Sequence, residues 1–71
     1  MAAHHGTARR LGQGRFIFTD GSGDVRVAIP AELLQGKEID ESSMVRIRGR
    51  TELDFNGTPE INVRELEVVS S

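Results

Sequence analysis

The stretch RFIFTDGSGDVRVAI, residues 15–29, contains two short runs in which apolar and other side chains alternate. Phe16 and Phe18 fall on one face of the first run, and Val25, Val27 and Ile29 share a face of the second. A period of two in runs rich in aromatic and β-branched residues is typical of β-strands. The glycines between the runs suit a tight turn, so this stretch predicts a β-hairpin.

A short helical segment is predicted after this hairpin. Pro30 ends the second strand because proline has no N–H to donate to a sheet. Residues 31–35 are long enough for about one helical turn, and Gly36 is a plausible C-cap. We expect Leu33 and Leu34 to plug one end of a barrel.

A second hairpin is predicted in the C-terminal half. Residues 44–50 alternate with Gly49 on the inner face, and a glycine there indicates a tight bend of the sheet. Asn56-Gly57 is a strong signal for a hairpin turn. Residues 61–63 resume the alternation, and a shift of phase before Leu66 predicts a β-bulge.

These elements predict an all-β fold, a small five-stranded Greek-key barrel of the OB (oligonucleotide/oligosaccharide-binding) type with one short helical turn. A chain of 71 residues allows one domain. Residues 2–11 form a poor strand by composition. We therefore interpret residues 1–9 as a leader, a tag remnant or a doubtful first strand, with the barrel over residues 10–71. An incomplete first strand would leave an open edge and favour a homo-oligomer.

One hydrophobic core is predicted from the shared phase of the apolar positions in each strand. Its members are Phe16, Phe18, Val25, Val27, Ile29, Val45, Ile47, Ile61 and Val63.

The composition restricts the function. There is no cysteine, hence no disulfide and no thiolate metal site. No run approaches the ~20 apolar residues of a membrane-spanning helix. The N-terminus also lacks the apolar segment of a signal peptide, which favours a cytoplasmic protein or a mature fragment. A net charge of −2 argues against a dedicated nucleic-acid-binding protein, which usually has a basic excess.

A row of arginines is the strongest candidate ligand site. Arg46, Arg48 and Arg50 alternate on one strand, about 6.6–6.8 Å apart by strand geometry. Arg26 would lie nearby if its strand pairs alongside. Guanidinium groups bind phosphates and carboxylates in a bidentate manner, so an anionic ligand is one interpretation. The alternative is a solvated face on which Glu52, Glu65 and Glu67 balance the arginines.

Other candidate residues have a structural alternative. Phe55, next to the Asn-Gly turn, is either an exposed stacking platform for bases or a packed residue. His4 and His5 are better explained as a tag or tail than as metal ligands. The sequence contains no nucleophile with an adjacent base, so we expect neither an enzyme nor a metal or other cofactor.

The ordered set of strands resembles the bacterial OB-fold (BOF) stress-tolerance family. The matching segments are RLGQGRFIFTD (10–20), GDVRVAI (23–29), VRIRGR (45–50) and EINV (60–63). The resemblance implies a small periplasmic binding protein without established enzymatic activity, implicated in resistance to oxidants and cationic peptides. Family members usually carry a secretion signal and a helical lead-in, which this sequence lacks.

Three functions are compatible with the sequence. The first is a non-enzymatic OB-fold binding module of the periplasm, with an unidentified anionic ligand or a protein partner. The second is a single-stranded nucleic-acid-binding domain that uses the arginine row and Phe55. The third is an engineered or minimal barrel with no ligand.

Overall fold

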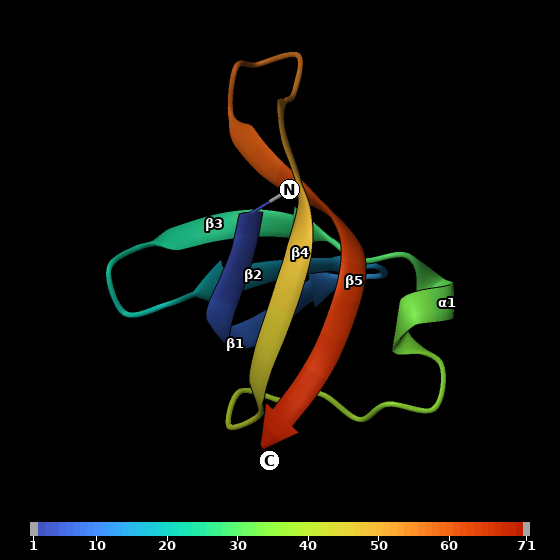
Figure 1. Cartoon of the computed structure of the whole chain (residues 1–71). Helices are drawn as coiled ribbons and strands as arrows, with labels where there is room; N and C mark the ends of the chain where they lie inside the picture. Colours follow the sequence, from blue (N-terminus) through green and yellow to red (C-terminus); the bar gives the residue numbers. More distant parts are fainter. Residues whose placement is uncertain (1, 71) are drawn as a thin grey trace.

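The computed structural model describes residues 2–70, which form a closed barrel of five strands (Figure 1). The elements in chain order are β1 (Ala2–Gly12), β2 (Arg15–Thr19), β3 (Asp24–Ala28), α1 (Ala31–Leu34), β4 (Met44–Leu53) and β5 (Pro59–Ser70). Neighbours around the barrel follow the order β1-β2-β3-β5-β4, and β4 closes onto β1. The β3–β5 pair is parallel, and the other pairs are antiparallel. The predicted OB-type barrel with one short helical turn is therefore confirmed.

The barrel interior is the predicted core with two adjustments. Eight of the nine predicted residues are buried, whereas Val25 is half-buried and packs against the others. Ala8 of β1 is an additional buried member. The period-two phase of the strands therefore located the core correctly.

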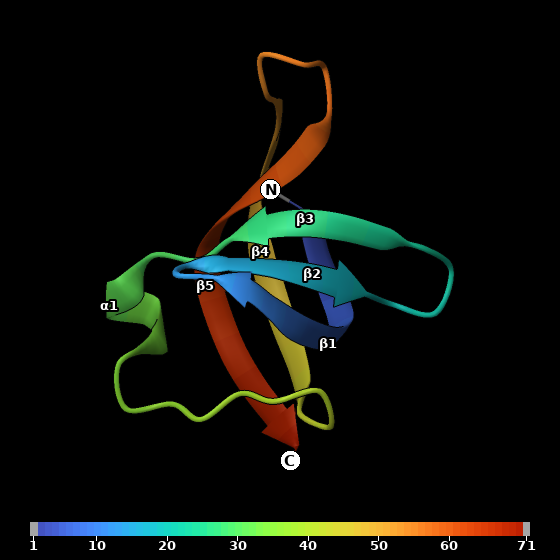
Figure 2. The ribbon, with the colours of Figure 1, turned by 180° about the vertical axis from the view of Figure 1, so that it is seen from behind.

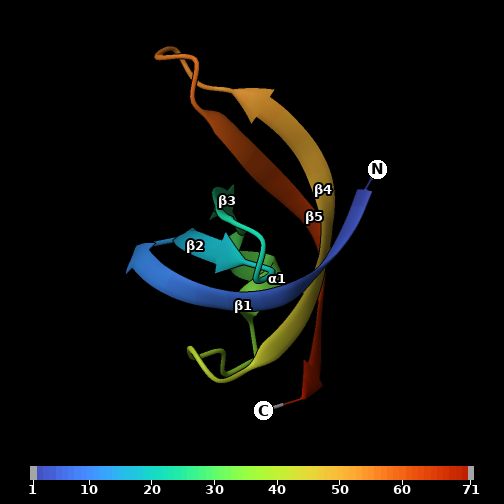
Figure 3. The ribbon, with the colours of Figure 1, turned by 90° about the vertical axis from the view of Figure 1, so that its left-hand side faces the viewer.

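Of the alternatives left open for residues 1–9, a leader, a tag remnant or a doubtful first strand, the structure shows residues 2–9 within the first strand of the barrel. Residues 2–6 of β1 pair with β4, and residues 7–12 pair with β2, so one long strand bridges both (Figures 1 and 3). Two inward positions, Gly6 and Ala8, are small where β1 passes close over β2. A Cβ on Gly6 would lie 2.1 Å from the Thr19 carbonyl oxygen. Met1 and Ser71, which the predicted boundaries include, lie outside the described residues.

Because β1 pairs on both sides, the condition for the predicted homo-oligomer is not met. That prediction depended on an incomplete first strand and an open barrel edge.

The β4–β5 hairpin bends sharply where it leaves the barrel. Gly49 is buried, and a Cβ there would lie 2.2 Å from the Asn62 carbonyl oxygen. Arg48 pairs with Glu65 and Gly49 with Val63, so one residue of β5 is unpaired and forms the predicted bulge. Beyond this bend the two strands continue to Leu53 and Pro59, and their connecting loop projects away from the barrel (Figures 1 and 3).

One end of the barrel is covered by α1 and the segments beside it (Figure 2). Leu33 and Leu34 are half-buried and pack against the core, as predicted for a plug. Gly36 follows the helix with a φ of 75°, a left-handed conformation that a side chain disfavours. Within residues 2–70, no helix has the length and apolar character needed to cross a membrane.

Candidate functional site

The arginine row of β4 points outward, where two of its members face glutamates of β5. Arg46 Nε lies 3.5 Å from Glu67 Oε1, and Arg48 Nη1 lies 3.6 Å from Glu65 Oε2. All four side chains are partly exposed, and water screens such pairs. At these two arginines the structure therefore shows the alternative considered from the sequence, a solvated face on which glutamates balance the arginine charges.

The other two arginines of the predicted site are placed differently. Arg50 lies opposite Asn62 on β5, where Arg46 and Arg48 have a glutamate. The side-chain amide of Asn62 donates a 2.6 Å hydrogen bond to Glu52 Oε1. Arg26 lies on β3, opposite Ile17 of β2 and Glu60 of β5. Since β5 separates β3 from β4, the structure does not bring Arg26 beside the arginine row.

The three phenylalanines divide between the core and the surface. Phe16 and Phe18 are buried, as expected for core residues, and the guanidinium carbon of Arg10 lies 5.4 Å from the Phe16 ring centroid. Phe55 is 97% exposed at the end of the β4–β5 hairpin. Phe55 is therefore available for contact, but it projects from the hairpin loop rather than from the face of the arginine row.

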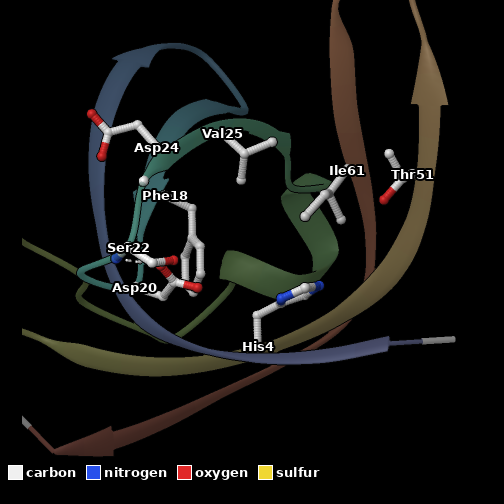
Figure 4. Close-up of a pocket in the computed structure, with 9 residues that line it drawn as sticks. His4, Phe18, Asp20, Ser22, Asp24, Val25, Thr51 and Ile61 are labelled. Atoms are coloured by element: carbon white, nitrogen blue, oxygen red, sulfur yellow. Dashed lines mark hydrogen bonds between the residues drawn. The ribbon is translucent and has the colours of Figure 1, made fainter.

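A hollow at one end of the barrel gathers residues from all five strands. Its volume is about 300 Å³. The apolar part consists of Phe18, Val25 and Ile61. The remaining lining residues are His4, Asp20, Ser22, Gly23, Asp24 and Thr51. Figure 4 shows these side chains around the opening, with α1 lying behind them.

Asp20 gives the hollow a fixed negative charge. Its Oδ1 atom accepts hydrogen bonds from the Ser22 hydroxyl at 2.6 Å and the Ser22 backbone N–H at 2.9 Å. These two bonds hold the pKa of Asp20 below its ordinary value, so the carboxylate is ionised at neutral pH. Asp24 also borders the hollow, but its carboxylate points away from the opening in Figure 4, so Asp20 supplies the charge that faces the hollow.

Sequence reasoning placed none of the residues of the hollow in a ligand site, and it interpreted His4 as part of a tag or tail. His4 pairs with Ile47 on the inward side of β1, and its ring meets Phe18 edge-on, with centroids 6.3 Å apart. Its neighbour His5 points outward, opposite Arg46. The sequence does contain a signal for the inward position of His4, because it is in phase with Gly6 and Ala8 at a period of two. The adjacent His4-His5 pair resembles a tag, and this obscured the signal.

Among residues 2–70, no group of three or more His, Cys, Asp or Glu side chains is arranged to hold a metal ion.

Comparison with known proteins identifies the family. The family model described as "Bacterial OB fold (BOF) protein" matches residues 5–68. A solved structure, the hypothetical protein ygiW from E. coli, superposes with a TM-score of 0.86 at 26% sequence identity. The match covers 96% of this chain and 73% of that one. No curated protein matches the sequence. The extent of the family match shows that this chain belongs to the bacterial OB-fold (BOF) family.

Proposed function

We propose that this protein is a non-enzymatic binding module whose ligand site is the hollow at the open end of the barrel. The observation that carries the proposal is the convergence of all five strands on one hollow with an apolar floor and polar rim. Binding sites commonly combine an apolar lining with a few convergent polar groups. OB folds, moreover, are binding scaffolds in many proteins.

The chemistry of the hollow favours a small ligand with an apolar part and a cationic group. Phe18 and Ile61 are buried beneath the hollow and Val25 is half-buried at its wall, so the apolar part of a ligand would pack mainly against Val25. The ionised Asp20 carboxylate attracts positive charge. The arginine row is a weaker candidate for the anionic ligand considered from sequence, because Arg46 and Arg48 already face glutamates.

The resemblance to the stress-tolerance family supports a periplasmic location and a role in tolerance of oxidants or cationic peptides. An acidic hollow with an apolar floor is consistent with such a role. Fractionation of the native bacterium by osmotic shock checks the location, which cytoplasmic retention would contradict.

A pair of aspartate variants tests the hollow. We expect benzamidine, an aromatic cation, to bind with a dissociation constant of about millimolar, as its small size dictates. Asp20→Asn should weaken this binding by about two- to fivefold, the range of an exposed ion pair. Calorimetric titration measures both values.

Asp40→Asn is the matched control. Asp40 accepts equivalent hydrogen bonds from Ser42, and its pKa is also lowered, but it does not line the hollow. Its replacement should leave benzamidine binding unchanged. Equal effects of the two variants, or tighter binding of benzoate than of benzamidine, would contradict the proposed site.

The nucleic-acid alternative predicts a different result. If three or four arginines neutralise phosphates, the salt slope for a single strand is only about −2 to −3, so binding fades at physiological salt. We expect little or no binding of a short oligo-dT in fluorescence anisotropy at about 0.15 M salt. Sub-micromolar affinity that disappears when Arg46, Arg48 and Arg50 are changed to serine would favour the nucleic-acid function instead.

A further inference from the structure

The loop of the β4–β5 hairpin, residues 54–58, and the last residue of β4, Leu53, present the two most exposed large apolar side chains of the described residues. Phe55 is 97% exposed and Leu53 is 69% exposed. Figure 3 shows this loop projecting beyond the rest of the barrel. Because the Phe55 ring is almost wholly in water, it contributes no burial to the fold, and its exposure has an unfavourable hydration cost.

The same loop is held in one conformation by Asp54. Its Oδ1 atom accepts hydrogen bonds from the backbone N–H groups of Asn56 at 2.8 Å and Thr58 at 2.9 Å. Its own backbone N–H and C=O groups bond to Thr58 and Gly57, respectively. The order of the loop therefore does not depend on Phe55. An anchor on an ordered loop loses less conformational entropy on binding than an anchor on a mobile one.

The net charge of the loop and its flanks is negative, because Arg26 of β3, which pairs with Glu60, offsets only one of three carboxylates. Residues 52–60 contain Glu52, Asp54 and Glu60 and no lysine or arginine. This charge is unfavourable for nucleic-acid phosphates and for anionic lipid head groups. It is also unfavourable for a second copy of the hollow, which carries the Asp20 carboxylate. A protein surface with basic side chains complements it.

From these observations we infer that the hairpin loop is a protein-docking element. Phe55 is its anchor, and the partner is a protein with an apolar pocket bordered by lysine or arginine. Aromatic side chains that fill a pocket commonly dominate the binding energy of an interface, and complementary charges speed association and select the partner. This surface is separate from the hollow, so it does not depend on the ligand proposed there.

Site-specific photo-crosslinking in the native bacterium tests the inference. The full chain carries benzoylphenylalanine in place of Phe55, or in place of Val69 as a control. Val69 is 53% exposed at the other end of β5. We expect one protein adduct from position 55 that is absent from position 69.

The captured protein is then purified and its affinity for the chain is measured. Phe55→Ser should weaken binding by roughly tenfold or more, as for an interface anchor. The melting temperature should stay unchanged, because the ring is exposed. Raising the salt from about 0.05 to about 0.5 M should also weaken binding, since charges on the rim are screened. Asp20→Asn should leave this affinity unchanged.

Several results would overturn the inference. The first is the lack of an adduct specific to position 55. The second is an adduct at that position with another copy of the chain, with nucleic acid or with lipid. The third is binding of the captured protein that changes neither with Phe55→Ser nor with salt.

Discussion

Replacing Gly49 with alanine is expected to unfold the domain or to cost more than about 4 kcal/mol, which is exceptional for one substitution. The added Cβ would lie 2.2 Å from the Asn62 carbonyl oxygen and 2.9 Å from the Val63 Cα. Both are backbone atoms of the paired strand, so no side-chain rotation relieves the contact. At about 0.05–0.15 kcal/mol per residue, the whole domain has only about 4–10 kcal/mol to lose. Urea denaturation measures the change.

Gly12→Ala is the control for this variant. A Cβ at Gly12 meets nothing within 4 Å, and the backbone there is not left-handed. We expect a change within about 1 kcal/mol, of either sign. If the Gly49→Ala protein is as stable as the Gly12→Ala protein, this result contradicts the close approach of β4 and β5 at the bend.

Replacing Ile47 with alanine is the second large effect. Ile47 is 1% exposed and points into the core from β4. Its truncation removes apolar contacts and leaves a cavity, which typically costs about 2–5 kcal/mol. The free energy of unfolding, from thermal or urea denaturation, should fall by that amount.

Leu53→Ala on the same strand is the matched apolar control. Leu53 lies beyond the barrel and is 69% exposed, so its truncation should cost less than about 0.5 kcal/mol. A loss below that value at Ile47 would show that the register of β4 is wrong.

Most of the fold could be predicted because its strands obey a simple alternation. The phase of Val45 and Ile47 selects the inner face, and a glycine in that phase marked the bend at Gly49. The first strand could be named only as a doubtful one, because the small residues Gly6 and Ala8 at its close passage over β2 give little periodic signal. Gly6 illustrates this, since a Cβ there would collide with Thr19.

The candidate site was harder to predict than the fold. The hollow exists only because the barrel brings His4, Phe18, Asp20 and Thr51 together from distant parts of the chain. The arginine row, in contrast, is visible in the sequence because its members alternate along one strand. Its ion pairs with β5 depend on the register and the bulge of the hairpin, which the sequence alone leaves open.

The most direct test of the proposed function is a residue-resolved NMR titration of the protein with benzamidine. Binding in the hollow predicts that the amide shifts of Phe18, Asp20 and Thr51 change together and saturate with one dissociation constant. The amides of Arg46 and Arg48, on the outer face of β4, should remain unperturbed. Saturable shifts confined to the arginine face, or no saturable shift anywhere, would contradict the assignment of the hollow as the ligand site.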